Sequence, residues 1–243
     1  MSERRTAYVA SAPPEAFIVP LVAAEVGEWL ERLPANARGA SRALDVGCGG
    51  QPFREQVERA GYRYFGMDLP QAKSPRVDFF GALDRELSPE LRAAPPFDLI
   101  LCTEVLEHVA DWETAFANLA RLLAPGGAVV ITAPHFYLGH EEPFDFWRPT
   151  PHAFAHFARR HGLQVAHQKT AGDVWSVLGT LISVGGISAR RRSPRVRLQV
   201  RVLNALLRAL RRALARGQLQ RDCEWQTPFY LSNVVVLRKS PVA

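Results

Sequence analysis

One short stretch of the chain, residues 134–150 (PHFYLGHEEPFDFWRPT), is dense in side chains that can move protons or bind polar groups. Histidine titrates near neutral pH, so His135 and His140 are predicted to be catalytic, one of them as a general base. The other polar side chains of the stretch are predicted to bind a substrate: Tyr137, Glu141, Asp145 and Arg148. The stretch is therefore predicted to hold a small molecule and to remove a proton from it.

Several polar residues also have a structural interpretation. Asp145 and Arg148 are three positions apart and can form a local ion pair that shapes the loop. His108 can contact a ligand or brace a helix. His152 and His156 stand at positions i and i+4 of a predicted helix, a spacing that can bind metal, but the sequence offers no obvious third ligand nearby. We therefore expect no metal site.

A glycine turn at residues 43–53 (ALDVGCGGQPF) follows a short apolar run. Glycines let a ligand approach the backbone closely, and the start of a helix offers N–H groups to a polar or negative group. Gly47 and Gly49 are followed by Pro52 where a dinucleotide-binding turn needs its third glycine, and no GK[ST] of a P-loop follows. The turn thus predicts a nucleotide-like ligand and disfavours NAD.

The segments that position these residues alternate between short apolar runs and runs of helical periodicity, as is typical of βαβ units and a parallel sheet. Strands are predicted at residues 43–48, 62–68, 76–83, 97–103, 128–134, 163–170 and 229–239. The last of these alternates enough to lie at a sheet edge. Helices are predicted at residues 17–33, where the helix covers the start of the sheet, and at 53–60, 112–123 and 150–162.

A long segment, residues 171–228, separates the last two predicted strands, whereas connections usually run about 2–6 residues. Residues 174–188 are apolar but short, so we expect a buried helix and not a membrane-spanning one. Residues 196–216 predict a basic amphipathic helix, because arginines accompany an apolar stripe at helical spacing. That stripe consists of Val200, Leu203, Leu207, Leu210 and Leu214.

The net charge of +6 is concentrated in one part of the chain. Residues 190–221 contain eleven arginines and no Asp or Glu, and removing these eleven charges from +6 leaves −5 for the rest. We predict that residues 190–221 contact an anionic membrane or an acidic partner. The alternative is a lid or a homodimer element with a solvated arginine face.

Four ordered motifs between Leu44 and Thr150 resemble the class I S-adenosylmethionine-dependent methyltransferases, in particular the methyltransferase type 11/12 group. Residues 44–49 (LDVGCG) resemble the glycine motif of that family. Asp68 resembles the acidic residue that ends the second strand and binds the ribose hydroxyls. Residues 97–109 (FDLILCTEVLEHV) resemble the fourth-strand motif of the family. Residues 122–135 (LLAPGGAVVITAPH) resemble the helix, turn and fifth strand that follow it.

The resemblance implies an α/β fold: a Rossmann-like, mostly parallel sheet of seven strands with the last strand antiparallel, helices on both faces and a helical insertion before the last strand. We expect a single methyltransferase domain over 1–243, made of an N-terminal helical cover (1–39), a cofactor-binding core (40–170), a helical insertion or lid (171–228) and the last strand (229–239).

The resemblance also implies S-adenosylmethionine as cofactor. Asp68 lies 21 positions after Gly47, which fits the spacing of about 20 expected for a ribose partner. Relatives often place an acidic residue after the third strand, where this chain has Ala82 and Leu83, so the adenine contact there is expected through backbone and apolar packing. The cofactor contacts implied are Asp45, Gly47, Cys48, Gly49, Asp68, Leu69, Ala82, Leu83, Cys102, Thr103 and His108. In such folds Glu104, Glu107 and His108 face the substrate.

The sequence as a whole predicts methyl transfer from S-adenosylmethionine to a nitrogen or oxygen of a small molecule, such as a sugar, a polysaccharide precursor or a secondary metabolite. One alternative is a nucleic-acid methyltransferase that uses the arginines, although residues 103–108 (TEVLEH) differ from the [DN]PP[YF] type and no aromatic residues interleave the arginines. Another is a non-catalytic cofactor-binding or scaffold subunit. Three widely separated cysteines and the lack of an apolar leader predict a cytoplasmic protein.

Overall fold

The structure of the protein, a computed structural model, describes residues 8–35, 41–70, 77–184, 187–188, 193–217, 221–223 and 228–240. The arginines of the basic segment at positions 190–192 lie outside the described residues. None of the described helices is both long and apolar enough to cross a membrane.

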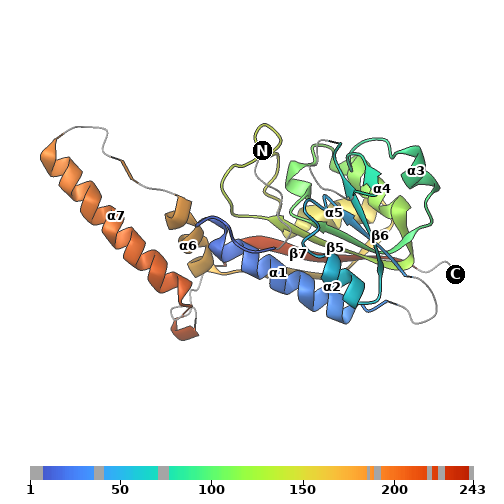
Figure 1. Ribbon diagram of the computed structural model, residues 1–243, viewed down its shortest axis with the longest axis horizontal. Helices are drawn as coiled ribbons and strands as arrows, with labels where there is room; N and C mark the ends of the chain where they lie inside the picture. The colour runs from blue at the N-terminus through green and yellow to red at the C-terminus, as the bar shows by residue number, and fades with distance from the viewer. Residues whose placement is uncertain are drawn as a thin grey trace.

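A seven-stranded sheet forms the centre of the molecule, with the strand order β3-β2-β1-β4-β5-β7-β6 (Figure 1). Strand β7 is antiparallel to both of its neighbours, and the other pairs are parallel. This arrangement confirms the predicted Rossmann-like sheet. The strands are β1 (Arg42–Val46), β2 (Arg63–Asp68), β3 (Phe79–Phe80), β4 (Phe97–Thr103), β5 (Leu123–Pro134), β6 (Leu163–Ala171) and β7 (Ser232–Lys239).

The prediction that the last strand lies at the sheet edge was wrong. Strand β7 lies between β5 and β6, and six consecutive residues from Ser232 are buried. A strand covered on both faces needs apolar side chains on both, which Val234 to Leu237 provide. The edge belongs to β6, where exposed residues alternate with less exposed ones. Strand β5 also begins earlier than predicted, because Leu123 already pairs with Phe97 of β4.

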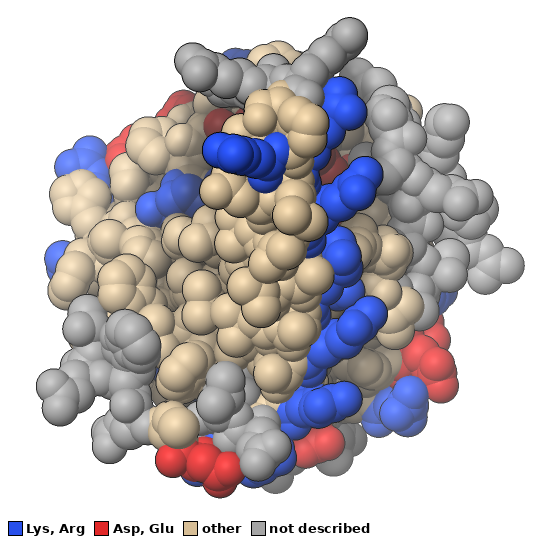
Figure 2. Space-filling view, turned by 90° about the vertical axis from the view of Figure 1, so that its left-hand side faces the viewer, with Lys and Arg blue, Asp and Glu red and all other residues tan. Residues whose placement is uncertain are grey.

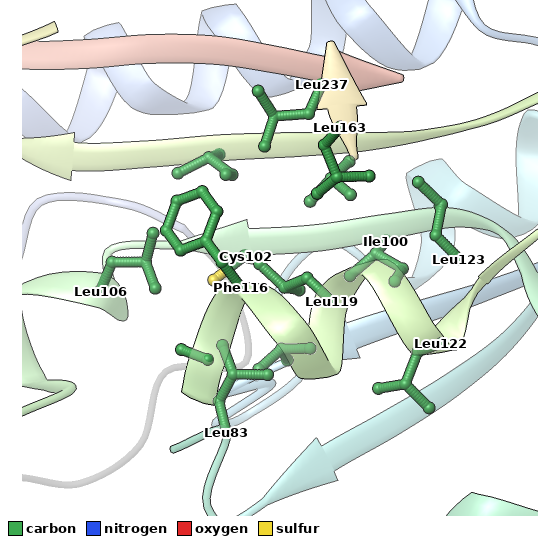
Figure 3. Close-up of a cluster of buried hydrophobic side chains, with 14 of the residues drawn as sticks. Leu83, Ile100, Cys102, Leu106, Phe116, Leu119, Leu122, Leu123, Leu163 and Leu237 are labelled. Atoms are coloured by element: carbon green, nitrogen blue, oxygen red, sulfur yellow. The ribbon is translucent and has the colours of Figure 1, made fainter. Parts of the chain in front are cut away.

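Helices cover both faces of the sheet (Figure 1). Helix α4 packs its apolar side, including Phe116 and Leu119, over Ile100 and Cys102 of β4, as Figure 3 shows. The opposite face is covered by α1 and α2, with α6 packed against α1. The helices are α1 (Glu15–Arg32), α2 (Arg54–Arg59), α3 (Pro89–Ala93), α4 (Trp112–Leu122), α5 (Pro151–Arg160), α6 (Val174–Val184) and α7 (Pro194–Ala215), with a 3-10 turn η1 (Leu106–His108).

The helical insertion leaves the sheet after β6 and reaches far from it. Figure 1 shows α7 at one end of the molecule, with α6 between it and the sheet. Helix α6 is anchored on α1, because Gly179 lies directly against the ring of Phe17. A Cβ at this position would overlap three carbons of that ring. This contact sets how closely the two helices approach.

We expect Gly179→Ala to destabilise the protein although it improves helix propensity. Alanine in a helix interior is favoured over glycine by about 1 kcal/mol, but overpacking against Phe17 costs about 1–3 kcal/mol. Gly27→Ala in α1 is the matched control, because its Cβ would meet only the Gln56 side chain at 4.0 Å. Denaturant unfolding should show a loss of stability for the first variant and a gain for the second. Equal gains would contradict the proposed close contact.

Candidate active site

The glycine turn after β1 folds back onto the neighbouring strand. The N–H groups of Gly47 and Cys48 both donate to the carbonyl of Met67 at the end of β2, over 2.8 and 3.1 Å. Gly47 has a φ of 68°, and a Cβ there would lie 2.5 Å from Cγ2 of Val105. Both the backbone conformation and the close approach of Val105 therefore require glycine at position 47.

The carboxylate of Asp68 is fixed against this turn. Its Oδ2 accepts a hydrogen bond from the N–H of Gly49 over 2.9 Å, and its Oδ1 accepts one from the N–H of Leu69 over 2.7 Å. The residue is only 5% exposed. A fixed negative charge beside the turn disfavours a phosphate and suits a ligand that presents hydroxyl groups to a carboxylate.

Asp45 of β1 is buried in the sheet, where its Oδ2 accepts a hydrogen bond from the hydroxyl of Tyr64 over 2.7 Å. Burial raises the pKa of Asp45 to about 7, although the Tyr64 hydrogen bond acts in the opposite direction. Asp45 thus joins β1 to β2 and stands at the balance between its neutral and charged forms near pH 7.

The other predicted cofactor contacts differ in how accessible their side chains are. Leu69 is 45% exposed, and Ala82 and Thr103 are half-buried, so these side chains can meet a ligand. Cys48, Leu83 and Cys102 are buried. The Leu83 side chain packs in the core and its carbonyl accepts a hydrogen bond from Asn118 over 2.8 Å. A ligand would meet these three through their backbone.

Two glutamates follow β4 at the same edge of the sheet. Glu104 has a φ of 52°, and removal of its carboxyl group from water raises its pKa to about 7. Glu107 in η1 is fully buried, and neither of its carboxyl oxygens has a hydrogen-bond partner among the described residues. Burial, and then the negative charge of Glu104, raise the pKa of Glu107 well above its ordinary value.

The loop predicted to bind substrate folds over these glutamates. The carbonyl of Glu107 accepts hydrogen bonds from the N–H groups of Phe146 and Trp147, over 2.8 and 3.2 Å. The indole of Trp147 in turn donates to the carbonyl of Val109 over 2.9 Å. Backbone bonds between loop and 3-10 turn therefore hold the two segments together.

Arg148 shapes the loop from within. It forms a two-pronged ion pair with Asp145, over 2.6 and 2.7 Å, and also donates to the carbonyls of Tyr137, Leu138 and Trp147. Partial burial opposes ionisation of Asp145, but hydrogen bonds from Arg148 and from the His140 N–H outweigh it and lower its pKa to about 2. The local ion pair considered for these residues is present, and it occupies the groups predicted to bind substrate.

His140 lies in a cluster of rings at the inner side of the loop. Its ring meets those of His108 and Tyr137 edge to face, with centroids 4.7 and 5.4 Å apart. Its Nδ1 lies 3.2 Å from the Leu138 carbonyl, and Nδ1 of His108 lies 2.9 Å from the Phe144 carbonyl. Carbonyls require a donor, so the two Nε2 atoms are assigned the lone pairs. Burial and then the neighbouring His108 lower the pKa of His140, which favours its neutral form.

His135, the other predicted catalytic histidine, is held apart from this cluster. Its Nδ1 lies 3.0 Å from the Pro149 carbonyl, and its ring stacks on Tyr230 with centroids 4.3 Å apart. Tyr230 belongs to the segment before β7, and no spacing in the sequence indicated this contact. Glu141 is exposed in the loop, with a φ of 53°.

Glu107, His108 and His140 have the donor set of a divalent-cation site. Their ligand atoms all lie within 4.8 Å of one another. Imidazole and carboxylate groups together suit a transition metal or Mn²⁺, and each histidine already orients its ring through a backbone carbonyl. The expectation of no metal rested on the spacing of His152 and His156, whereas this cluster joins residues more than 30 positions apart.

A hollow of about 280 Å³ adjoins the cluster and can receive an acceptor. Its lining is formed by Tyr137, Gly139, Asp145, Phe146, Trp147 and Arg148. A second hollow, of about 310 Å³, lies at the opposite edge of the sheet near Ser41, Asp98 and Gly126. Ligands of open parallel sheets bind outside the carboxyl ends of the strands, so the first hollow is the candidate site.

The buried Asp45 makes stability depend on pH. Because its pKa in the folded protein is raised above the value of about 3.9 in an unfolded chain, the folded state holds the extra proton and loses stability as pH rises from about 4 to 7. Between pH 5 and 7 this loss is about 2–3 kcal/mol. Asp45→Asn keeps an acceptor for Tyr64 and removes the contribution of Asp45, so the variant should lose about 2–3 kcal/mol less stability than the wild type between pH 5 and 7. The measurement is the free energy of unfolding, from denaturant titrations at pH 5 and pH 7. An equal change in the wild type and the variant would contradict the prediction.

Comparisons with known proteins show which family this fold and sequence belong to. Residues 21–171 match a family model described as a methyltransferase domain. Ubiquinone biosynthesis O-methyltransferase of Bordetella avium is 35% identical over 112 residues, which are 42% of this chain and 46% of the relative. Its counterpart from Aromatoleum aromaticum is 33% identical over 113 residues, 42% of this chain and 47% of the relative. The chain thus matches about half the length of these curated relatives.

Solved structures share the fold at low sequence identity. A SAM-dependent methyltransferase from Archaeoglobus fulgidus superposes with a TM-score of 0.56 at 15% identity, over 90% of this chain and 94% of that one. An O-methyltransferase of a Brevibacillus brevis polyketide synthase, in complex with S-adenosylhomocysteine, gives 0.53 at 16% identity, over 91% and 72%. The family model covers more than half of the chain, including the glycine turn, Asp68 and the strand ends. The chain belongs to the class I S-adenosylmethionine-dependent methyltransferase family.

Proposed function

We propose that the protein transfers a methyl group from S-adenosylmethionine to a hydroxyl oxygen of a small molecule. The observation that carries the cofactor assignment is the Asp68 carboxylate, fixed against a glycine turn at the carboxyl edge of the sheet. Oxygen as acceptor, and a small molecule in place of a nucleic acid, are supported by the names of the curated relatives. A sugar, a polysaccharide precursor and a secondary metabolite are the acceptor classes to test.

In this proposal the cofactor lies across the ends of β1 and β2. The ribose hydroxyls face Asp68, the exposed side chain of Leu69 covers the base, and the backbone at Ala82 and Leu83 borders the adenine. The glycine turn admits the rest of the cofactor close to the main chain. A sulfonium carries a positive charge, and the acidic groups at this edge favour it electrostatically.

The acceptor occupies the hollow beside the loop. Methyl transfer is an in-line displacement, so the main requirement is to hold the hydroxyl oxygen in line with the methyl group. In this proposal Nε2 of His140 takes the hydroxyl proton, because Nδ1 of the neutral ring faces the Leu138 carbonyl. Tyr137 lines the same space, and Asp145 and Arg148 fix the loop that forms its wall. His135, stacked on Tyr230, is not among the described residues that line this hollow.

A divalent cation held by Glu107, His108 and His140 is a second way to activate the hydroxyl. Such a cation, when bound, lowers the pKa of a hydroxyl beside it. The fully buried Glu107 carboxyl would then gain the partner that the described residues do not give it. His140 would serve as a ligand in place of a base.

The cofactor assignment predicts that S-adenosylhomocysteine binds with a dissociation constant in the micromolar range, a free energy on the order of −8 kcal/mol. Asp68→Asn should weaken binding about 10- to 100-fold, because two ribose hydroxyls lose a charged acceptor. Asp98→Asn is the matched control, since Asp98 also accepts a backbone N–H, from Arg42, but at the opposite edge. Calorimetry that detects no binding, or equal affinity in all three proteins, excludes the assignment.

The two ways of activating the hydroxyl predict different responses to a chelator. His140→Ala should lower turnover about 100-fold or more in either case, with unchanged affinity for S-adenosylhomocysteine. If His140 is the base, wild-type turnover survives treatment with EDTA. If it is a ligand, turnover is lost and returns with added Mn²⁺ or Mg²⁺, and Glu107→Gln abolishes the recovery. Near wild-type turnover in both His135→Ala and His140→Ala would leave catalysis to positioning alone.

A further inference from the structure

Helix α7 presents a continuous apolar face to solvent. Leu198, Val202, Leu206 and Leu210 follow one another at four-residue intervals, which places them along one side of the helix. Leu198 and Leu206 are 61% and 62% exposed. Exposed apolar side chains also occur on α6 and just after it: Leu181, Val184 and Ile187. An apolar surface of this extent indicates an interaction site.

An arginine stripe runs along the side of α7 next to this apolar face. Arg197, Arg201, Arg208 and Arg212 recur at intervals of four and seven residues, and Figure 2 shows a column of basic side chains beside uncharged surface. No Asp or Glu occurs between residues 174 and 221. None of these four arginines pairs with an acidic side chain of the described residues, so their charge is available to a partner.

The orientation of α7 is fixed by its contacts with the preceding segment. The side-chain amide of Asn204 accepts from the Ile187 N–H and donates to the Ile187 carbonyl, over 3.0 and 2.8 Å. Leu214 is buried near the end of the helix, and Val200 and Leu207 are half-buried on the same side. These contacts turn one side of α7 inward and leave both the apolar face and the arginine stripe outward.

We propose that α7 docks on the surface of an anionic phospholipid bilayer. The apolar face would enter the boundary between headgroups and acyl chains, and the arginine stripe would meet the lipid phosphates, which is the geometry of interfacial amphipathic helices. A second copy fits less well as the occupant, because it would bring two arginine stripes together with no acidic side chains between them.

Docking through α7 would bring the site edge of the sheet near the membrane. The insertion begins where β6 ends at Ala171, and β6 runs in the same direction as β5, so it leaves the sheet at the edge that carries the candidate active site. The N–H of Leu231 donates to the Ala171 carbonyl over 2.9 Å, and the Leu231 carbonyl accepts from the N–H of His135 over 2.7 Å. The proposal stands on α7 itself and does not require methyl transfer.

Flotation of the full chain with vesicles tests the proposal. Vesicles of phosphatidylcholine alone are compared with vesicles that also contain phosphatidylglycerol, at about 0.1 M and about 1 M salt. The wild type should float with the anionic vesicles and bind them more weakly at high salt. Replacing Arg197, Arg201 and Arg208 by Gln should reduce binding on the order of 100-fold, from roughly fivefold per arginine. Leu206→Glu with Leu210→Glu should reduce it at least tenfold.

A charge-matched variant separates this stripe from overall charge. Replacing the exposed Arg59, Arg85 and Arg92 of the body by Gln changes the net charge equally and should leave flotation unchanged. Thermal unfolding and S-adenosylhomocysteine binding check that each variant is folded. No flotation, or equal flotation with neutral vesicles, overturns the proposal. So does a dimer in sedimentation that Leu206→Glu with Leu210→Glu dissociates while the flotation of this variant persists. Binding to polyglutamate without flotation also overturns it, in favour of an acidic protein partner.

Discussion

The site depends on which acceptors bind the backbone N–H groups of the tight turn after β1. Met67 takes two of them through its carbonyl, and Asp68 takes the next through its carboxylate. Both acceptors come from the end of β2, so the turn after β1 is fixed by its neighbouring strand before any ligand arrives. A turn that has already given up these donors cannot serve as an anion cradle. What it offers is a smooth backbone surface with a carboxylate at its side.

The opposite wall of the site is held by bonds of another kind. The guanidinium of Arg148 donates hydrogen bonds to three carbonyls and one carboxylate, all within its own loop. Glu107 takes part twice: its carbonyl holds the loop backbone, while its carboxyl group is buried and accepts no hydrogen bond from the part of the chain that the structure describes. A rigid loop is thus stacked on a carboxyl group that gains from any cation or donor brought to it.

The sequence predicted best those features that depend on residues close together in the chain. Strand β4 was predicted to the residue, because the apolar run from Leu99 to Cys102, bounded by Asp98 and Thr103, fits a strand of a parallel sheet that is buried on both faces. The position of β7 was not predicted, because its sequence does not show whether one neighbouring strand or two pair with it. The grouping of Glu107 with His140 depends on how a loop folds. The stacking of His135 on Tyr230 depends on a segment that comes nearly 100 residues later in the chain. The apolar stripe predicted for α7 lies largely on its inward side, where Val200 and Leu207 are half-buried and Leu214 is buried. The outward apolar face of Leu198, Val202 and Leu206 was not predicted.

The order of strands also constrains how the molecule is built. Strand β6 reaches the rest of the sheet only through β7, and β5 pairs with β7 across about 100 residues of chain. Until residues 232–239 have been synthesised, the inner edge of β5 has no partner on that side and β6 has none at all. The whole helical insertion must therefore leave the ribosome before the sheet can close. Such long-range closure slows folding and leaves an apolar strand edge open to chaperones in the meantime.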